Sequence, residues 1–159
     1  MQSVPALEER TRVIKLEGEV EQVFALFGPR RERDWAEGWD PNIVWPTDGT
    51  LQERMVFLRS PHGDRPETMW VVSRYDERQA VIEYTVFAPE SVRWILIQCR
   101  AADDGQATEA KIAYTFVGAS ESACQHNTRR LDALFRHDLR DWETAINHYL
   151  RTGERLSHH

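Results

Sequence analysis

Three polar side chains interrupt otherwise apolar strand faces in this sequence, and they are its first candidates for chemistry. Glu53 shares a face with a methionine and a phenylalanine, because successive side chains in a strand point to opposite sides. Tyr84 and Tyr114 stand in the same way among isoleucine, valine and phenylalanine. A buried glutamate without a cationic partner has a raised pKa, since desolvation disfavours its charged form. A salt bridge from Glu53 to Arg33 or Arg74 is the alternative, and the residues alone favour it.

Metal and nucleophile chemistry find little support in the sequence. His126, His137 and His148 recur every eleven residues, so on a helix they point the same way to within ~20° but lie ~16 Å apart. Ligands of one zinc ion must converge to bonds of ~2 Å, so these histidines cannot share one. Cys99 and Cys124 have no context that lowers a thiol pKa. No nucleophile elbow, phosphate loop or dinucleotide glycine motif is present. The sequence therefore predicts no metal and no cofactor.

Composition bounds the class of protein. A chain of 159 residues predicts one domain over residues 1–159, with a core at about 11–153. It has 18 arginines, two lysines and 26 acidic residues, and a net charge of −6 opposes binding to nucleic acid. The longest strongly apolar run, Trp94–Ile97, is far shorter than the ~20 residues that cross a membrane. No signal peptide is visible, so we expect a cytoplasmic protein with no membrane insertion. The mixed-charge run Arg30–Asp34 is interpreted as a solvated helix face and not as an anion site.

Hydrophobic periodicity predicts an α+β protein. Apolar residues between Glu19 and Gly28 follow helical spacing, and Pro29–Gly38 is predicted as a second short helix. Steps of three and four from Ser120 to Gly153 predict one helix of ~45 Å. Alternating segments bounded by turns indicate an antiparallel meander. The predicted strands are Thr11–Leu16, Asn42–Pro46, Leu51–Arg59, Thr68–Tyr75, Ala80–Phe87, Ser91–Ala101 and Thr108–Val117.

One strand is ambiguous because it is apolar on both faces. Within Ser91–Ala101 the inward set is either Trp94 and Leu96 or Ile95 and Ile97. The other strands alternate more cleanly, which suits a sheet with one solvated face.

Several segments of the chain together follow a pattern that is shared with a known superfamily. They are Val23–Phe27, Glu32–Asp40, Gly49–Phe57, Thr68–Asp76 and Asn147–Gly153. On these residues the sequence resembles the START-like superfamily, also called SRPBCC, which includes polyketide cyclases and the major birch-pollen allergen family. The Trp-x-x-x-Trp-Asp pattern within Glu32–Asp40 is similar to that of an uncharacterised bacterial subgroup. The likeness extends from about Val13 to Gly153.

The resemblance implies the helix-grip fold, in which a curved antiparallel sheet of about seven strands wraps around a long C-terminal helix, with two short helices. It also implies a cavity between the sheet and that helix, which holds a lipid-like or aromatic, polyketide-like molecule. In this architecture Trp35, Trp39 and Trp45 border the mouth of the cavity, where they form a gate or anchor a loop. The residues expected to bind the ligand are Trp35, Trp39, Trp45, Glu53, Met55, Phe57, Trp70, Tyr84, Trp94, Tyr114, Phe116, Phe135 and Trp142.

Two functions follow from the resemblance, and a third stands apart from it. The first is a binding module for a hydrophobic small molecule, which the absence of a catalytic motif favours. The second is an enzyme of the cyclase, dehydratase or hydrolase type, in which Glu53 acts as acid or base with Tyr84 or Tyr114. The third is a protein-interaction domain with an exposed patch around Trp39 and Trp45. The sequence indicates no oligomeric state.

Overall fold

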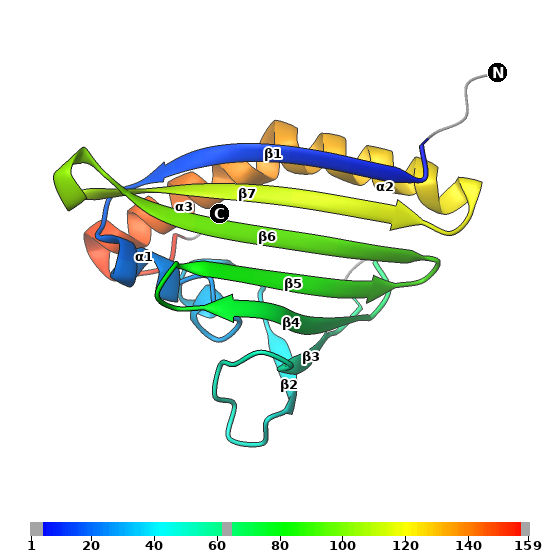
Figure 1. The fold of residues 1–159 in the computed structure, drawn as a ribbon, viewed down its shortest axis with the longest axis horizontal. Helices are drawn as coiled ribbons and strands as arrows, with labels where there is room; N and C mark the ends of the chain where they lie inside the picture. Colours follow the sequence, from blue (N-terminus) through cyan, green and yellow to red (C-terminus); the bar gives the residue numbers. More distant parts are fainter. Residues whose placement is uncertain (1–4, 62–64, 157–159) are drawn as a thin grey trace.

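The chain forms a seven-stranded antiparallel sheet that curves around its C-terminal helices (Figure 1). The computed structural model describes residues 5–61 and 65–156. The strands lie in the order β1-β7-β6-β5-β4-β3-β2. The predicted helix-grip architecture is confirmed. The strand bounds are β1 Leu7–Leu16, β2 Pro41–Trp45, β3 Val56–Arg59, β4 Thr68–Asp76, β5 Val81–Ala88, β6 Ser91–Ala102 and β7 Ala107–Gly118.

The helices differ from the sequence prediction in two places. The first short helix, α1, is Val20–Ala25, but the second is only a 3₁₀ turn, η1, at Arg31–Asp34. The long C-terminal helix consists of α2 and α3, joined by a π-helical turn, η3. No helix of the described chain is long and apolar enough to span a membrane. The remaining bounds are η2 Asp103–Gly105, α2 Glu121–Ala133, η3 Leu134–Asp138 and α3 Leu139–Thr152.

The ends of the C-terminal helix follow ordinary capping chemistry. The hydroxyl of Ser120 accepts a hydrogen bond from the backbone N–H of Ala123 at 3.1 Å, which satisfies one free donor of the first turn. Gly153 ends α3 in the left-handed conformation, with φ of 75°. Between these caps the helix runs along β1 and β7 (Figure 1), and it leaves the β2–β3 end of the sheet uncovered.

The third strand is shorter than predicted, and this overturns the expected position of Glu53. The backbone N–H of Met55 bonds to the carbonyl of Gln52 at 3.2 Å, and Arg54 has a φ of 73°. This turn breaks the strand alternation just before β3 begins at Val56. Met55 is therefore buried while Glu53 is exposed, so the prediction that they share an inward face is wrong.

The structure resolves the ambiguity of β6. Tyr84 pairs with Ile95 across the β5–β6 ladder, and residues that pair in this way project from the same face of the sheet. Ile95 and Ile97 are buried on the concave side, and Trp94 and Leu96 lie on the outer face. Placing Trp94 among the inward residues is therefore wrong.

Three side-chain hydrogen bonds order the segment between α1 and β2. One of them ties the segment to the sheet, and the other two lie within it. The hydroxyl of Tyr84 donates to the carbonyl oxygen of Phe27 at 2.6 Å. The indole N–H of Trp35 donates to the carbonyl of Leu26 at 2.8 Å, and that of Trp39 donates to the carbonyl of Pro29 at 2.6 Å. This segment has little regular structure of its own, so these bonds take the place of a backbone ladder.

A buried threonine provides a test of how the sheet is tied to the turn that follows β1. Thr108 on β7 is fully buried, and its hydroxyl donates to the carbonyl of Gly18 at 2.8 Å. We expect Thr108→Val to lower the free energy of unfolding by about 1–3 kcal/mol, because it leaves that carbonyl without its partner. Urea denaturation measures the change. Thr115→Val on the same strand removes an exposed bond to Glu9 and serves as the control, with an expected change within about 0.5 kcal/mol. Equal losses for the two variants would contradict this interpretation.

Candidate functional site

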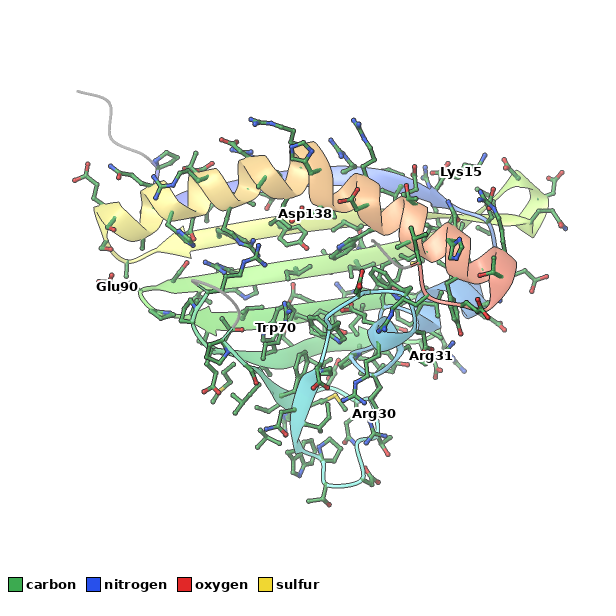
Figure 2. All side chains as sticks on the ribbon, turned by 180° about the vertical axis from the view of Figure 1, so that it is seen from behind. Lys15, Arg30, Arg31, Trp70, Glu90 and Asp138 are labelled. Atoms are coloured by element: carbon green, nitrogen blue, oxygen red, sulfur yellow. The ribbon has the colours of Figure 1, made fainter. Side chains whose placement is uncertain are left out.

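Two adjoining chambers lie between the concave face of the sheet and the C-terminal helices. The inner chamber has a volume of about 210 Å³ and the outer chamber of about 330 Å³. In Figure 2, Asp138 lies on the helical side of this space and Trp70 on the sheet side. The two chambers are parts of one site, because they share wall residues. The shared residues are Arg59, Arg65, Trp70, Val86, Arg93 and Arg130.

Seven aromatic side chains line the inner chamber. Trp70 stacks on Phe57 and meets Trp39 edge-on, with ring centres 5.5 Å apart in both pairs. The indole N–H of Trp70 donates to the hydroxyl of Thr68 at 2.9 Å, which fixes the ring on the sheet. The predicted site residues that line this chamber are Trp35, Trp39, Trp70, Tyr84, Tyr114, Phe116 and Trp142.

Three other predicted residues lie behind this wall. Met55 and Phe57 are buried, and Phe57 supports the ring of Trp70 from below. Phe135 on the π-helical turn packs edge-on against Tyr114, with ring centres 5.8 Å apart. These residues shape the chamber without lining it.

The last three predicted residues lie away from both chambers. Trp45 is 46% exposed at the end of β2, and Trp94 lies on the outer face of the sheet. Glu53 is exposed, and its carboxylate accepts a hydrogen bond from the backbone N–H of Tyr75 at 3.3 Å. It is not paired with Arg33, whose guanidinium contacts Asp40 instead. The expected position of Glu53 inside the cavity is therefore corrected.

The buried acid of the chamber is Glu32, which the sequence pattern assigned to a solvated face. It lies on η1, is 7% exposed and lines the inner chamber. Burial raises the pKa of Glu32 well above its usual range, and the positive charge of Arg59 opposes this shift. A 3₁₀ turn has three residues per turn, so helical periodicity does not reveal which residue of Arg31–Asp34 points inward.

The two tyrosines on the wall differ in what their hydroxyls do. Tyr84 donates to the backbone of Phe27, so its hydroxyl helps to hold the fold. Burial raises the pKa of Tyr114 far above its usual value, and the charge of Glu32 acts in the same direction. Glu32 and Tyr114 are thus electrostatically coupled inside one aromatic chamber.

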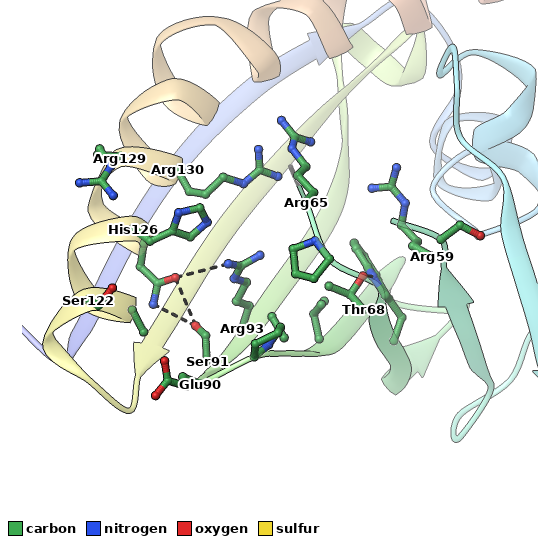
Figure 3. A pocket seen from close by; sticks show the side chains of 18 residues that line it. Arg59, Arg65, Thr68, Glu90, Ser91, Arg93, Ser122, His126, Arg129 and Arg130 are labelled. Atoms are coloured by element: carbon green, nitrogen blue, oxygen red, sulfur yellow. Dashed lines mark hydrogen bonds between the residues drawn. The ribbon is translucent and has the colours of Figure 1, made fainter. Parts of the chain in front are cut away.

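Four arginines stand where the two chambers meet, and the sequence analysis assigned none of them to the site. They come from β3, the segment before β4, β6 and α2, and Figure 3 shows them entering the same space. A register argument could have found the one on β6, because it lies two residues before Ile95 and so shares its face. They are Arg59, Arg65, Arg93 and Arg130.

Metal ligands do not gather in the part of the chain that the structure describes. No group of three His, Cys, Asp or Glu residues within it could hold a metal ion. His126 lines the outer chamber, but its two spaced counterparts lie further along the helix. Burial raises the pKa of the Cys99 thiol to about 12, which favours the unreactive protonated form.

A wider groove at the opposite end of the sheet has a different character. It has a volume of about 720 Å³ and lies between α1 and the turn that joins β4 to β5. Glu21, Glu77, Arg78 and Arg100 on its sides are exposed, so it offers little desolvated surface for a ligand. The two aromatic and cationic chambers are the better candidate site.

Comparison with known proteins identifies the fold. The sequence matches no protein-family model, and no curated protein of similar sequence was found. Norcoclaurine synthase from Thalictrum flavum superposes with a TM-score of 0.70 at 9% identity, over 92% of this chain and 87% of that one. Ara h 8.0201 superposes with a TM-score of 0.58 at 14% identity, over 92% of this chain and 99% of that one. A protein from Nitrosospira multiformis has a TM-score of 0.66 at 15% identity, over 91% and 99%. At these identities the likeness concerns architecture alone, and the chain has the helix-grip fold that these proteins share.

Proposed function

We propose that this protein binds a small molecule with an apolar body in the inner chamber. The observation that carries the proposal is the wall itself, on which tryptophan, tyrosine and phenylalanine rings surround an unfilled volume of about 210 Å³. Binding sites for small molecules are typically such concave, mostly apolar spaces with a few polar groups that set orientation.

The wall is well suited to hold its shape when empty. Trp35 and Trp39 are tied to backbone carbonyls, and Trp70 is tied to Thr68. A preformed site spares the ligand the entropy of ordering these rings, which favours binding. The same bonds favour an anchoring role for Trp35 and Trp39 over that of a gate.

A relative of the same architecture supports a small aromatic ligand. Norcoclaurine synthase has been solved in complex with dopamine and hydroxybenzaldehyde, at 10% identity and a TM-score of 0.65 to this chain. Those ligands belong to that enzyme. They support the proposal only in that this architecture can enclose single aromatic rings.

A second candidate function is acid–base catalysis on the bound molecule. Glu32 favours it, because burial raises the pKa of this carboxyl and favours its protonated form, which can donate a proton to a bound molecule. Tyr114 is a further polar group on the same wall. These two residues replace the pairing with Glu53 that the sequence suggested.

Filling the chamber tests the binding proposal. Val86 is 2% exposed and lines both chambers, so a phenylalanine there projects into the space a ligand would occupy. We expect Val86→Phe to weaken binding of 2-naphthol, measured by calorimetry, by about tenfold or more, which corresponds to ~1.4 kcal/mol. Its unfolding temperature should fall little, because overpacking costs ~1–3 kcal/mol only where the core is already filled.

The matched control for this experiment is Val13→Phe on β1. Val13 is 51% exposed and lines neither chamber, so this variant should bind 2-naphthol like the wild type. Unchanged binding in Val86→Phe, or equal loss in both variants, would place the ligand elsewhere.

The state of Glu32 is testable through stability. Its folded-state pKa lies above the ordinary value of 4.5, so the wild type loses stability as pH rises from that value through the raised pKa. Glu32→Gln removes this loss, and its unfolding temperature should exceed that of the wild type by more at pH 8 than at pH 4. Glu53→Gln at an exposed site is the control and should show no such difference. A pH-independent effect of Glu32→Gln would show that the carboxyl titrates normally.

A further inference from the structure

The junction between the chambers concentrates positive charge in a protein of opposite net charge. The whole chain carries −6, yet arginines from four separate elements line both chambers. The outer chamber adds Arg129 and His126, and Glu90 at its rim is the single acid among the described residues of its wall. Figure 3 shows Arg59, Arg65, Arg93 and Arg130 projecting into the space between α2 and the sheet.

Arg93 lies in surroundings that are unfavourable for a cation. Its side chain is half-buried, and its Nε is buried without a hydrogen-bond partner among the described residues. The guanidinium lies over the ring of Phe116 at 4.7 Å, and it donates one long hydrogen bond, of 3.5 Å, to the amide oxygen of Asn127. Burial, together with the charges of Arg130 and Arg65, lowers the pKa of Arg93 to about 10. The fold therefore holds this cation in a position that disfavours its charge.

Arg59 is held in a similar way on the other side of the junction. Its guanidinium lies over the ring of Trp39 at 4.4 Å. Burial lowers the pKa of Arg59. The positive charges of Arg65 and Arg130 lower it further, and the negative charge of Glu32 opposes this shift. Because burial favours the neutral form of Glu32, this acid compensates Arg59 only in part.

The acids of the inner chamber lie on its helical and η1 sides. Glu37 and Asp138 line it together with Glu32, and the sheet side contributes no acid among the described wall residues. The cations instead form a band across the opening, with the aromatic wall on one side and the outer chamber on the other. Guanidinium groups bind carboxylate and phosphate oxygens through paired hydrogen bonds, and such bonds are strongest where water is excluded.

We propose that the ligand is an amphipathic anion, whose carboxylate or phosphate head binds Arg59, Arg65, Arg93 and Arg130 while its apolar body fills the inner chamber. This inference rests on the proposed binding function and defines the chemical class of its ligand. A bound oxyanion screens the repulsion among the four cations.

The test compares ligands that share a body and differ in the head. We expect 2-naphthoate and 2-naphthyl phosphate to bind at least about tenfold more tightly than neutral 2-naphthol by calorimetry, since hydrogen bonds to charged groups are the strong ones. Raising NaCl from 50 to 300 mM should weaken the binding of the two anions and leave the binding of 2-naphthol unchanged. The tighter of the two anions identifies the preferred head. Inorganic phosphate should bind more weakly than the naphthyl phosphate, because it lacks the body.

Arg93→Gln separates the proposed role from a structural one. This substitution should weaken the binding of both anions by about tenfold or more, and the affinity for 2-naphthol should stay within about twofold of the wild type. The unfolding temperature of the variant should not fall, because a disfavoured charge is removed. Arg100→Gln is the matched control on the same strand. Arg100 is exposed and paired with Glu109 at 2.9 Å, so this variant should bind all compounds like the wild type.

Three results would overturn the proposal, and they differ in what they leave standing. Equal affinity for the neutral and anionic compounds refutes the anionic head but keeps the binding function. Absence of binding for the whole series refutes both. Inorganic phosphate that binds as tightly as naphthyl phosphate also refutes the proposal, because the aromatic chamber would then contribute nothing.

Discussion

The hydrogen bond from Tyr84 to the carbonyl of Phe27 is the contact on which the site depends. It joins the middle of the sheet to the segment after α1, which has only one 3₁₀ turn to order it. A buried phenol without an acceptor and a buried carbonyl without a donor each cost free energy, so this single bond satisfies two groups. By fixing Phe27 it also fixes the position of η1, and with it the carboxyl of Glu32 and the indole of Trp35. The floor of the inner chamber is thus set by tertiary hydrogen bonds and not by local helix propensity.

This dependence explains why the sheet could be predicted and the acid could not. Strand alternation depends on neighbours two residues apart, and it placed Tyr84, Tyr114 and Phe116 on the concave face. It failed at Glu53, because the positive φ of Arg54 inserts a turn that no hydrophobic pattern reveals. Glu32 lies in a run of alternating charges, where only contacts with distant residues decide which side chain is buried.

The arginine cluster escaped prediction for a related reason. Arg59 and Arg130 lie about 70 residues apart in the sequence, and they line the same chamber only because α2 packs beside the concave face of the sheet. The inward position of Arg93 could not be predicted from β6 alone, because this strand is apolar on both faces. The pairing of β6 with β5 decides it. Because Tyr84 points inward, its partner Ile95 also points inward, and so does Arg93 two residues earlier.

The large excess of arginine over lysine in the sequence is consistent with this cluster. A planar guanidinium can stack on an aromatic ring and still present hydrogen bonds at its edge, as Arg59 does on Trp39 and Arg93 on Phe116.

Burial affects the charge of the acid and of the arginines differently, and this difference makes the two ends of the site unlike. At the inner end, desolvation favours the neutral form of Glu32. At the junction, guanidinium groups remain protonated even where burial lowers their pKa, so the positive charge persists. A molecule with one charged end therefore meets an apolar interior and a cationic opening in a fixed order. The polarity of the site sets which end of such a molecule enters first, and it does so before any specific hydrogen bond is formed.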